Sequence, residues 1–183
     1  MPIKCVAVYL GSKPGNSPIF VESARKMGQE LAKNGISIVY GGTNVGTMNA
    51  LANGAIEAEG KITGVIPEKF ASRSIGHDKI SQLILAKDLK ERKSIMEQMS
   101  DAAIILPGSY GTVDELFEYA VNNQLENLLR PIFLLNIHGF YNPLMEQLNN
   151  MVKHGFLTPQ LLSMIHPCES VGKIMELILK ETL

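Results

Sequence analysis

Short apolar runs that alternate with helical segments are the feature that most restricts the fold of this chain. The runs lie at residues 4–10, 36–40, 62–66, 80–86, 102–106 and 131–136, with a short edge strand expected at 163–166. Between them, apolar residues recur every three or four positions, as in helices that bury one face. Strands that alternate with helices form a parallel sheet covered on both faces. We therefore expect an α/β fold, a Rossmann-like doubly wound parallel sheet.

Length and composition fit one domain. The chain has 183 residues, of which 45% are hydrophobic and 19% charged, and its formal net charge is −1. No linker or repeat interrupts the alternation, so residues 1–183 are predicted to form a single domain. The absence of a basic excess predicts no nucleic-acid partner. The apolar runs are far shorter than the roughly 20 residues that span a bilayer, which predicts no membrane association.

The N-terminus, the cysteines and the histidines point to an ordinary cytoplasmic protein without metal or cofactor. Residues 1–6 lead directly into the first predicted strand, so we expect no signal peptide and a cytoplasmic location. Cys5 and Cys168 are isolated, and we expect them to be reduced and buried. The four histidines are scattered without metal-ligand spacing, so neither a metal nor a cofactor is expected.

Two glycine-rich loops follow predicted strands. Gly41-Gly-Thr-Asn-Val-Gly46 follows the run at 36–40, and Pro107-Gly-Ser-Tyr-Gly111 follows the run at 102–106. Glycine lets the backbone approach a ligand closely, and the helix N-terminus behind such a loop attracts phosphate. Because ligands in parallel sheets lie beyond the carboxyl ends of the strands, both loops predict a phosphate site. The dinucleotide fingerprint and the P-loop lysine are both absent, so neither of those sites is expected.

Two further local patterns concern the surroundings of these loops. Thr112-x-x-Glu115 fits a capping box, which predicts Thr112 as the N-cap of the following helix. The capping role alone would then explain the acid at position 115. In residues 68–79 the apolar residues follow neither helical nor strand spacing, so this segment is predicted to be a loop. It contains Arg73, Ser74, Gly76 and His77, which makes it a candidate active-site loop.

Arg92 occupies an unusual place on its predicted helix, residues 89–99. It lies at the centre of the apolar arc formed by Leu89, Ile95, Met96 and Met99 at about 100° per residue. Arginine is rarely buried without a partner, so we expect Arg92 to point inward, toward an anion or a carboxylate. The alternative is that its stem packs on the core while its head reaches water. Glu115 is the candidate partner and catalytic carboxylate, and Asp114 is a weaker candidate.

Two motifs in the chain resemble the signature of a known family. Leu89-x-x-Arg-Lys-x-x-Met96, followed by Pro107-Gly-Ser-Tyr-Gly-Thr-Val-Asp-Glu115, resembles the paired motifs of the Lonely Guy (LOG) family. That family consists of cytokinin riboside 5′-monophosphate phosphoribohydrolases, and many members carry an old "lysine decarboxylase" label. The likeness extends over nearly the whole chain, from Val8-Tyr-Leu-Gly-Ser12 to Gly139-Phe-Tyr141.

The resemblance implies a fold, an activity and an assembly. The fold is Rossmann-like, and the protein is at least a homodimer that takes part in cytokinin biosynthesis. The reaction is hydrolysis of the N-glycosidic bond of a nucleoside 5′-monophosphate, such as AMP or a cytokinin riboside monophosphate. Its products are the free base and ribose 5-phosphate.

The resemblance also assigns site residues. The family's essential arginine and glutamate correspond to Arg92 and Glu115. We expect substrate binding by residues of the two glycine loops and of the helix from residue 89: Gly42, Thr43, Gly46, Thr47, Leu89, Lys93, Gly108, Ser109, Gly111 and Thr112. The chain departs from the family pattern at Ser74, Ser109 and Asn122, which leaves the preferred base and the oligomer beyond a dimer open.

Two other functions are alternatives to the hydrolase. One is a non-catalytic carrier of a nucleotide or of the molybdenum cofactor on the same fold. The retention of both Arg92 and Glu115 favours the hydrolase. The other is a lysine decarboxylase, which would need a lysine that binds pyridoxal phosphate. Lys93 is the only candidate near the predicted site, and the fold predicted for this chain is not the one expected of a lysine decarboxylase.

Overall fold

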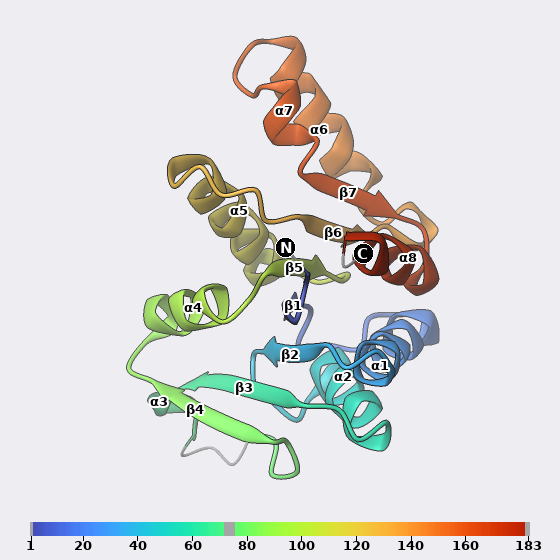
Figure 1. Ribbon diagram of the computed structural model, residues 1–183, viewed down its shortest axis with the longest axis vertical. Helices are drawn as coiled ribbons and strands as arrows, with labels where there is room; N and C mark the ends of the chain where they lie inside the picture. Colours follow the sequence, from blue (N-terminus) through green and yellow to red (C-terminus); the bar gives the residue numbers. More distant parts are fainter. Residues whose placement is uncertain (1, 72–75, 182–183) are drawn as a thin grey trace.

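The computed structural model describes residues 2–71 and 76–181. Over these residues, seven parallel strands form one sheet in the order β4-β3-β2-β1-β5-β6-β7 (Figure 1). The strands are β1 (Cys5–Tyr9), β2 (Ser37–Tyr40), β3 (Ile62–Pro67), β4 (Gln82–Ala86), β5 (Ala102–Ile105), β6 (Ile132–Leu135) and β7 (Ile165–Cys168). The predicted Rossmann-like α/β sheet is therefore confirmed.

Helices connect the strands and cover both faces of the sheet. They are α1 (Pro18–Lys33), α2 (Gly46–Glu57), α3 (Glu68–Ala71), α4 (Leu89–Gln98), α5 (Tyr110–Leu125), α6 (Asn142–Lys153), α7 (Pro159–Leu162) and α8 (Val171–Glu181), with a 3-10 turn η1 (Ile137–Gly139). α1, α2 and α8 pack on one face, and α4, α5 and α6 on the other (Figure 1). Within the described residues, no helix combines the length and apolar character needed to cross a bilayer.

The central strand shows how the sequence divides into two cores. Along β1, Val6 and Val8 belong to the core under α1, α2 and α8, whereas Ala7 and Tyr9 belong to the core under α4 and α5. Successive strand residues point to opposite faces, so a strand covered on both sides needs a continuous apolar run. This explains why the sequence shows short apolar runs rather than an alternation of apolar and polar residues.

The N-terminus of α5 differs from the expectation. The helix begins at Tyr110 with Ser109 as its N-cap, so the prediction that Thr112 caps the helix was wrong. The chain turns into the helix directly after Gly108, and Thr112 is packed beneath that turn: a Cβ on Gly108 would lie 2.0 Å from Thr112 Oγ1. Glu115 consequently belongs to the second turn of α5, and its carboxylate does not cap the helix.

The C-terminal edge strand and the cysteines also differ in part. β7 covers residues 165–168, two residues later than the expected strand at 163–166, and runs parallel to β6. Both cysteines are free thiols; Cys168 is buried in β7, whereas Cys5 is half-buried at the start of β1.

The strand order places a switch of chain direction at the centre of the sheet. The chain leaves β1 toward β2 on one side, and it leaves β5 toward β6 on the other. The loops behind these neighbouring strands therefore separate, which is where ligands bind in open parallel sheets. A hydrogen bond from Gly11 N to the Pro107 carbonyl, at 3.3 Å, joins the two loops at their bases.

Candidate active site

A cavity of about 410 Å³ lies at this switch point, beyond the carboxyl ends of the strands. It is lined by Leu10, Gly11, Ser12, Gly41, Thr43, Val45, Met48, Ile66, Pro67, Phe70, Leu89, Arg92, Ser109, Gly111, Thr112 and Glu115. These residues come from the loops after β1, β2 and β5, from the end of β3, from α2 and α3, from the first turn of α4 and from the first two turns of α5. The cavity therefore brings the two glycine loops together with the predicted arginine and glutamate.

Arg92 and Glu115 form a buried ion pair that faces this cavity. Arg92 Nη1 donates to Glu115 Oε1 at 2.7 Å, and the two side chains are 10% and 8% exposed. Arg92 Nε donates to the Val65 carbonyl of β3 at 3.1 Å. A Cβ at Gly41 would lie 2.6 Å from Arg92 Nη2, so only glycine there leaves room for the guanidinium. The prediction that Arg92 points inward to a carboxylate is confirmed, and the solvent-reaching alternative was wrong.

The Glu115 carboxyl lies under two opposing influences. Burial raises the pKa of Glu115 above its ordinary value, because the charged form loses its water. The charge of Arg92 and its hydrogen bond act against that rise, as does Lys93 to a smaller extent. The net direction is upward, so this carboxyl takes up a proton at a higher pH than an exposed glutamate does.

The first glycine loop is held against the loop that follows β1. A Cβ on Gly46, whose φ is +54°, would lie 2.2 Å from the Ser12 carbonyl oxygen. Thr47 Oγ1 donates to the Gly11 carbonyl at 2.5 Å. Gly42 adopts a φ of +74°. Glycine is therefore required at position 46, because the backbone there lies in close contact with the loop that follows β1.

The second glycine loop contains two glycines with different surroundings. Gly108 is required by packing, since Thr112 fills the space where its Cβ would lie. Gly111 lines the cavity, and a Cβ added to it would meet no atom of the described residues within 4 Å. Its backbone is also helical, so nothing in the described part of the protein explains a glycine at position 111.

A second pocket of about 560 Å³ adjoins the first. Gly11, Ser12 and Ser109 line both, and the second is completed by Lys13, Pro14, Gly15, Asn16, Phe20, Thr47, Pro107, Gly108 and Phe140. Phe20 and Phe140 meet edge to face there, with ring centroids 5.9 Å apart. Of the predicted binding residues, Thr43, Leu89, Ser109, Gly111 and Thr112 line the first pocket, and Thr47, Gly108 and Ser109 line the second.

Lys93, Gly42 and Gly46 are not among the lining residues of either pocket. Lys93 forms ion pairs with Asp114, at 2.9 Å, and with Glu118. Burial lowers the pKa of Lys93, but the hydrogen bonds and charges of Glu118 and Asp114 outweigh it and raise the pKa above the ordinary value. A lysine held in this way is a poor amine nucleophile, and its role in substrate binding stays a prediction.

The expected active-site loop is described only in part. Arg73 and Ser74 lie outside the described residues. Gly76 forms an antiparallel bridge with Thr43, and His77 N donates to the Gly42 carbonyl at 3.0 Å. His77 is buried and lines neither pocket. Gly76 and His77, at the end of this segment, therefore form backbone contacts with the first glycine loop.

Sequence reasoning missed several lining residues. Gly11 and Ser12 follow the central strand and line both pockets, yet they were not among the predicted site residues. Their position after β1 was the available signal, since the loops behind the two strands at a switch point border the ligand site. Phe20 carries no such signal, because an aromatic residue at helical spacing is equally typical of a core.

Comparisons with known proteins place the chain among related sequences. Residues 48–178 match the family model described as "Possible lysine decarboxylase". The chain is 36% identical over 169 residues to the cytokinin riboside 5′-monophosphate phosphoribohydrolase of Rhodococcoides fascians, covering 92% of this chain and 85% of that protein. It is 32% identical over 173 residues to an Arabidopsis thaliana protein of the same name, covering 94% and 81%.

Solved structures share the fold at lower identity. The molybdenum cofactor binding protein of Rippkaea orientalis superimposes with a TM-score of 0.77 at 24% identity, covering 100% of this chain and 99% of that one. The Moco carrier protein of Chlamydomonas rheinhardtii gives 0.72 at 19% identity, covering 96% and 95%. These likenesses show a common fold. The motif-bearing helices, the matched family model and the sequence relatives together establish that the chain belongs to the LOG family of cytokinin riboside 5′-monophosphate phosphoribohydrolases.

Proposed function

We propose that the protein hydrolyses the N-glycosidic bond of nucleoside 5′-monophosphates, AMP or cytokinin riboside monophosphates, to the free base and ribose 5-phosphate. The observation that carries this proposal is the buried Arg92–Glu115 pair, which faces a cavity bordered by both glycine loops. The names of the sequence relatives support the same reaction.

Glu115 is suited to the charge that this reaction develops. Cleavage of a glycosidic bond builds positive charge on the sugar in an oxocarbenium-like transition state. A carboxylate that borders the ribose stabilises this charge and orients the attacking water. Arg92 fixes the carboxylate in place and opposes its protonation; two unit charges about 4 Å apart attract by roughly 4 kcal/mol at an effective dielectric constant of 20.

The glycine loops are suited to the 5′-phosphate. In this proposal the donors are backbone N–H groups of the two glycine loops, of which Thr43, Val45, Ser109, Gly111 and Thr112 line the cavity. The N-terminus of the 16-residue helix α5 adds the positive end of its dipole. Gly111 leaves open space at this helix N-terminus. Phosphate bound there would serve as a handle that positions the reacting bond beside Glu115. The adjoining second pocket lengthens the cleft beyond the space that a ribose needs.

Chromatography of protein incubated with AMP tests this function. We expect free adenine and ribose 5-phosphate to appear, and an assay across the common nucleoside monophosphates and a cytokinin riboside monophosphate identifies the preferred base. The Glu115→Gln variant is the control for contaminating hydrolases. Intact nucleotide in every incubation would refute the hydrolase assignment.

The alternative is a non-catalytic carrier of a nucleotide or of the molybdenum cofactor. The solved structures with those names share the fold at 19–24% identity, which does not extend to a ligand. A carrier has no need for a buried carboxylate held by arginine beside the ligand, so the Arg92–Glu115 pair favours the hydrolase. Tight binding of AMP without release of adenine would favour the carrier.

We also propose that the protein is a cytoplasmic homodimer, as the family resemblance implies. Sedimentation equilibrium of the purified protein measures this directly, because one chain has a mass of 20.0 kDa. We expect a species of twice that mass, and a species of single-chain mass at micromolar concentration would contradict the dimer.

A further inference from the structure

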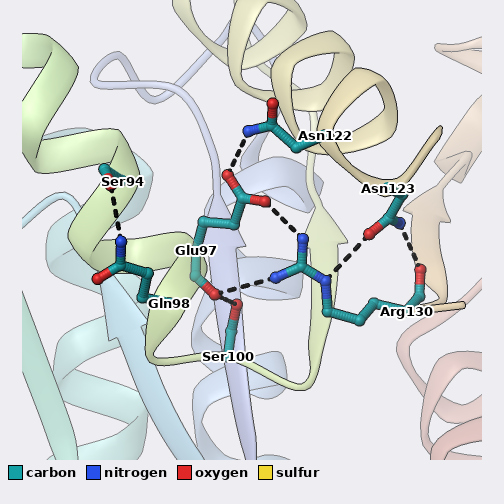
Figure 2. A network of polar contacts seen from close by, with 7 residues as sticks. All are labelled: Ser94, Glu97, Gln98, Ser100, Asn122, Asn123 and Arg130. Carbon is teal, nitrogen blue, oxygen red and sulfur yellow. Dashed lines mark hydrogen bonds and ion pairs between the residues drawn. The ribbon is translucent and has the colours of Figure 1, made fainter. Parts of the chain in front are cut away.

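A second polar network joins the two helices that carry Arg92 and Glu115 (Figure 2). Glu97, near the end of α4, accepts a hydrogen bond from Asn122 Nδ2 of α5 at 2.6 Å, through Oε2. Its other oxygen accepts from Arg130 Nη2 at 2.5 Å. Arg130 Nε donates to Asn123 Oδ1 at 3.0 Å, and Asn123 Nδ2 donates back to the Arg130 carbonyl at 2.8 Å.

The network is largely buried, and each of its side chains has a hydrogen-bond partner. The Glu97 and Arg130 side chains are 13% and 17% exposed, and Asn123 is 2% exposed. Arg130 Nη1 also donates to the Glu97 carbonyl, at 3.3 Å, so the guanidinium binds both the side chain and the backbone at the end of α4. Removing one partner of such a pair leaves a charge buried without compensation, which is costly. None of these residues lines either pocket.

The network and the Arg92–Glu115 pair connect α4 and α5 at different positions along the helix axes. Asn122 follows Glu115 by seven residues, which is about two helical turns, and thus lies on the same face of α5. Glu97 follows Arg92 by five residues on α4. The backbones of α4 and α5 make few close approaches, so long side chains set their spacing. Lys93 of α4, through its ion pairs with Asp114 and Glu118, connects the helices next to the Arg92–Glu115 pair. Glu97 adds an attachment near the other end of α4, and attachments at both ends of a helix fix its tilt as well as its distance.

Two tyrosine rings pack beside the network. The Arg130 guanidinium lies 4.5 Å from the centre of the Tyr119 ring, and Tyr119 meets Tyr9 of β1 edge to face at 6.4 Å. Burial raises the pKa of the Tyr9 phenol, and the negative charges of Glu115 and Glu97 raise it further. Tyr9 is therefore within electrostatic range of both ion pairs.

We propose that Glu97 and Arg130 are positioning residues, which hold α4 against α5 and so keep Arg92 within hydrogen-bond distance of Glu115. This inference rests on the proposed function for its kinetic consequence. Without the network, the C-terminal end of α4 loses its attachment to α5, while the Lys93 ion pairs and the Arg92–Val65 hydrogen bond still hold its N-terminal half. We expect α4 to tilt about that half and the Arg92–Glu115 hydrogen bond to lengthen. The carboxylate then loses the cation that opposes its protonation, while the glycine loops that bind phosphate are unaffected.

Glu97→Gln is the test variant, because it keeps the shape of the side chain and removes its charge. We expect kcat for adenine release to fall about tenfold with KM for AMP little changed, since geometry at the reacting bond is lost rather than ground-state binding. Arg130→Lys keeps the charge but loses the fork that binds Asn123 and the Glu97 carbonyl, and we expect a partial loss. Glu57→Gln is the matched control, because Glu57 pairs with Arg25 between α1 and α2, far from α4.

The pKa of Glu115, followed by NMR titration, separates positioning from other effects. The charged groups that act on Glu115 are Arg92 and Lys93 from α4 and Asp114 from α5. Loss of the negative charge at Glu97 alone would lower this pKa, whereas loosening of Arg92 raises it. We expect an increase in Glu97→Gln, a smaller one in Arg130→Lys and none in Glu57→Gln.

The titration does not depend on turnover, so it separates the two proposals. An inactive wild-type protein whose Glu115 pKa still rises in Glu97→Gln would refute the hydrolase and support the positioning role. Unchanged kcat and an unchanged or lower Glu115 pKa in a folded Glu97→Gln protein would overturn the positioning role. Should Glu97→Gln not fold, the same criteria apply to Arg130→Lys.

Discussion

At the scale of single residues, the function depends on whether Glu115 acts as a carboxylate. Glu115→Gln keeps the size of the side chain and its contact with Arg92, but removes the negative charge that would face the ribose. We expect turnover to fall about a thousandfold, comparable to the loss of one strong electrostatic group, with AMP binding largely retained. Calorimetric AMP titration and the adenine assay measure the two quantities separately. Glu146→Gln, at an exposed glutamate of α6, is the control. An active Glu115→Gln enzyme would remove Glu115 from the chemistry.

The raised pKa of Glu115 predicts an acid limit of activity. The ionised carboxylate is the active form, so the rate falls as the pH drops through the pKa of Glu115. Burial raises that pKa, so the rate falls at a higher pH than it would with an exposed glutamate, whose ordinary pKa is about 4.3. Arg92 opposes the rise, so Arg92→Met shifts the limit to still higher pH. The pH profile of kcat/KM for AMP measures both, and an acid limit unchanged by Arg92→Met would show that the pair does not control this proton.

At the scale of an element, the first turn of α5 offers a matched comparison between two glycines. Gly111 is the second residue of α5 and Gly172 the second residue of α8, and a Cβ added at either would have no atom of the described residues closer than 3.9 Å. Alanine at either position should stabilise the fold by about 0.4–1 kcal/mol, because it restricts the unfolded chain. Only Gly111→Ala is expected to weaken AMP binding, since its methyl group enters the cavity. Thermal unfolding and AMP titration measure the two effects, and equal AMP affinity in both variants would exclude phosphate from this helix N-terminus.

The order of the elements could be predicted from the sequence, because a doubly covered strand needs a continuous apolar run and helices repeat every 3.6 residues. The inward orientation of Arg92 followed from the same periodicity. The start of α5 could not be predicted: Ser109 and Thr112 are both good N-caps, and the packing of Thr112 under Gly108 decides between them. The Glu97–Arg130 network was equally inaccessible, since its members are 33 residues apart and carry no local pattern.

At the scale of the whole molecule, the cleft joins a phosphate site to a reacting centre. A substrate without the 5′-phosphate loses the loop contacts that place its glycosidic bond beside Glu115. We expect adenosine to be hydrolysed at least about a hundredfold more slowly than AMP, as for substrates truncated at a remote binding group. Initial rates of adenine release from the two compounds give the ratio, and a ratio near one would refute the role of the phosphate as a handle.

The strand order has a consequence for how the chain responds to its ligand. The cavity is bordered by the segments that follow β1, β2 and β3, by the first turn of α4 and by the first two turns of α5. β1 lies at the centre of the sheet, between its two halves. A nascent chain that ends before β5 lacks Ser109, Gly111, Thr112 and Glu115 of the cavity wall, so nucleotide can select only molecules in which both halves of the sheet have docked. AMP at a hundred times its dissociation constant would then add about 2.7 kcal/mol to the cooperative unfolding of the entire sheet.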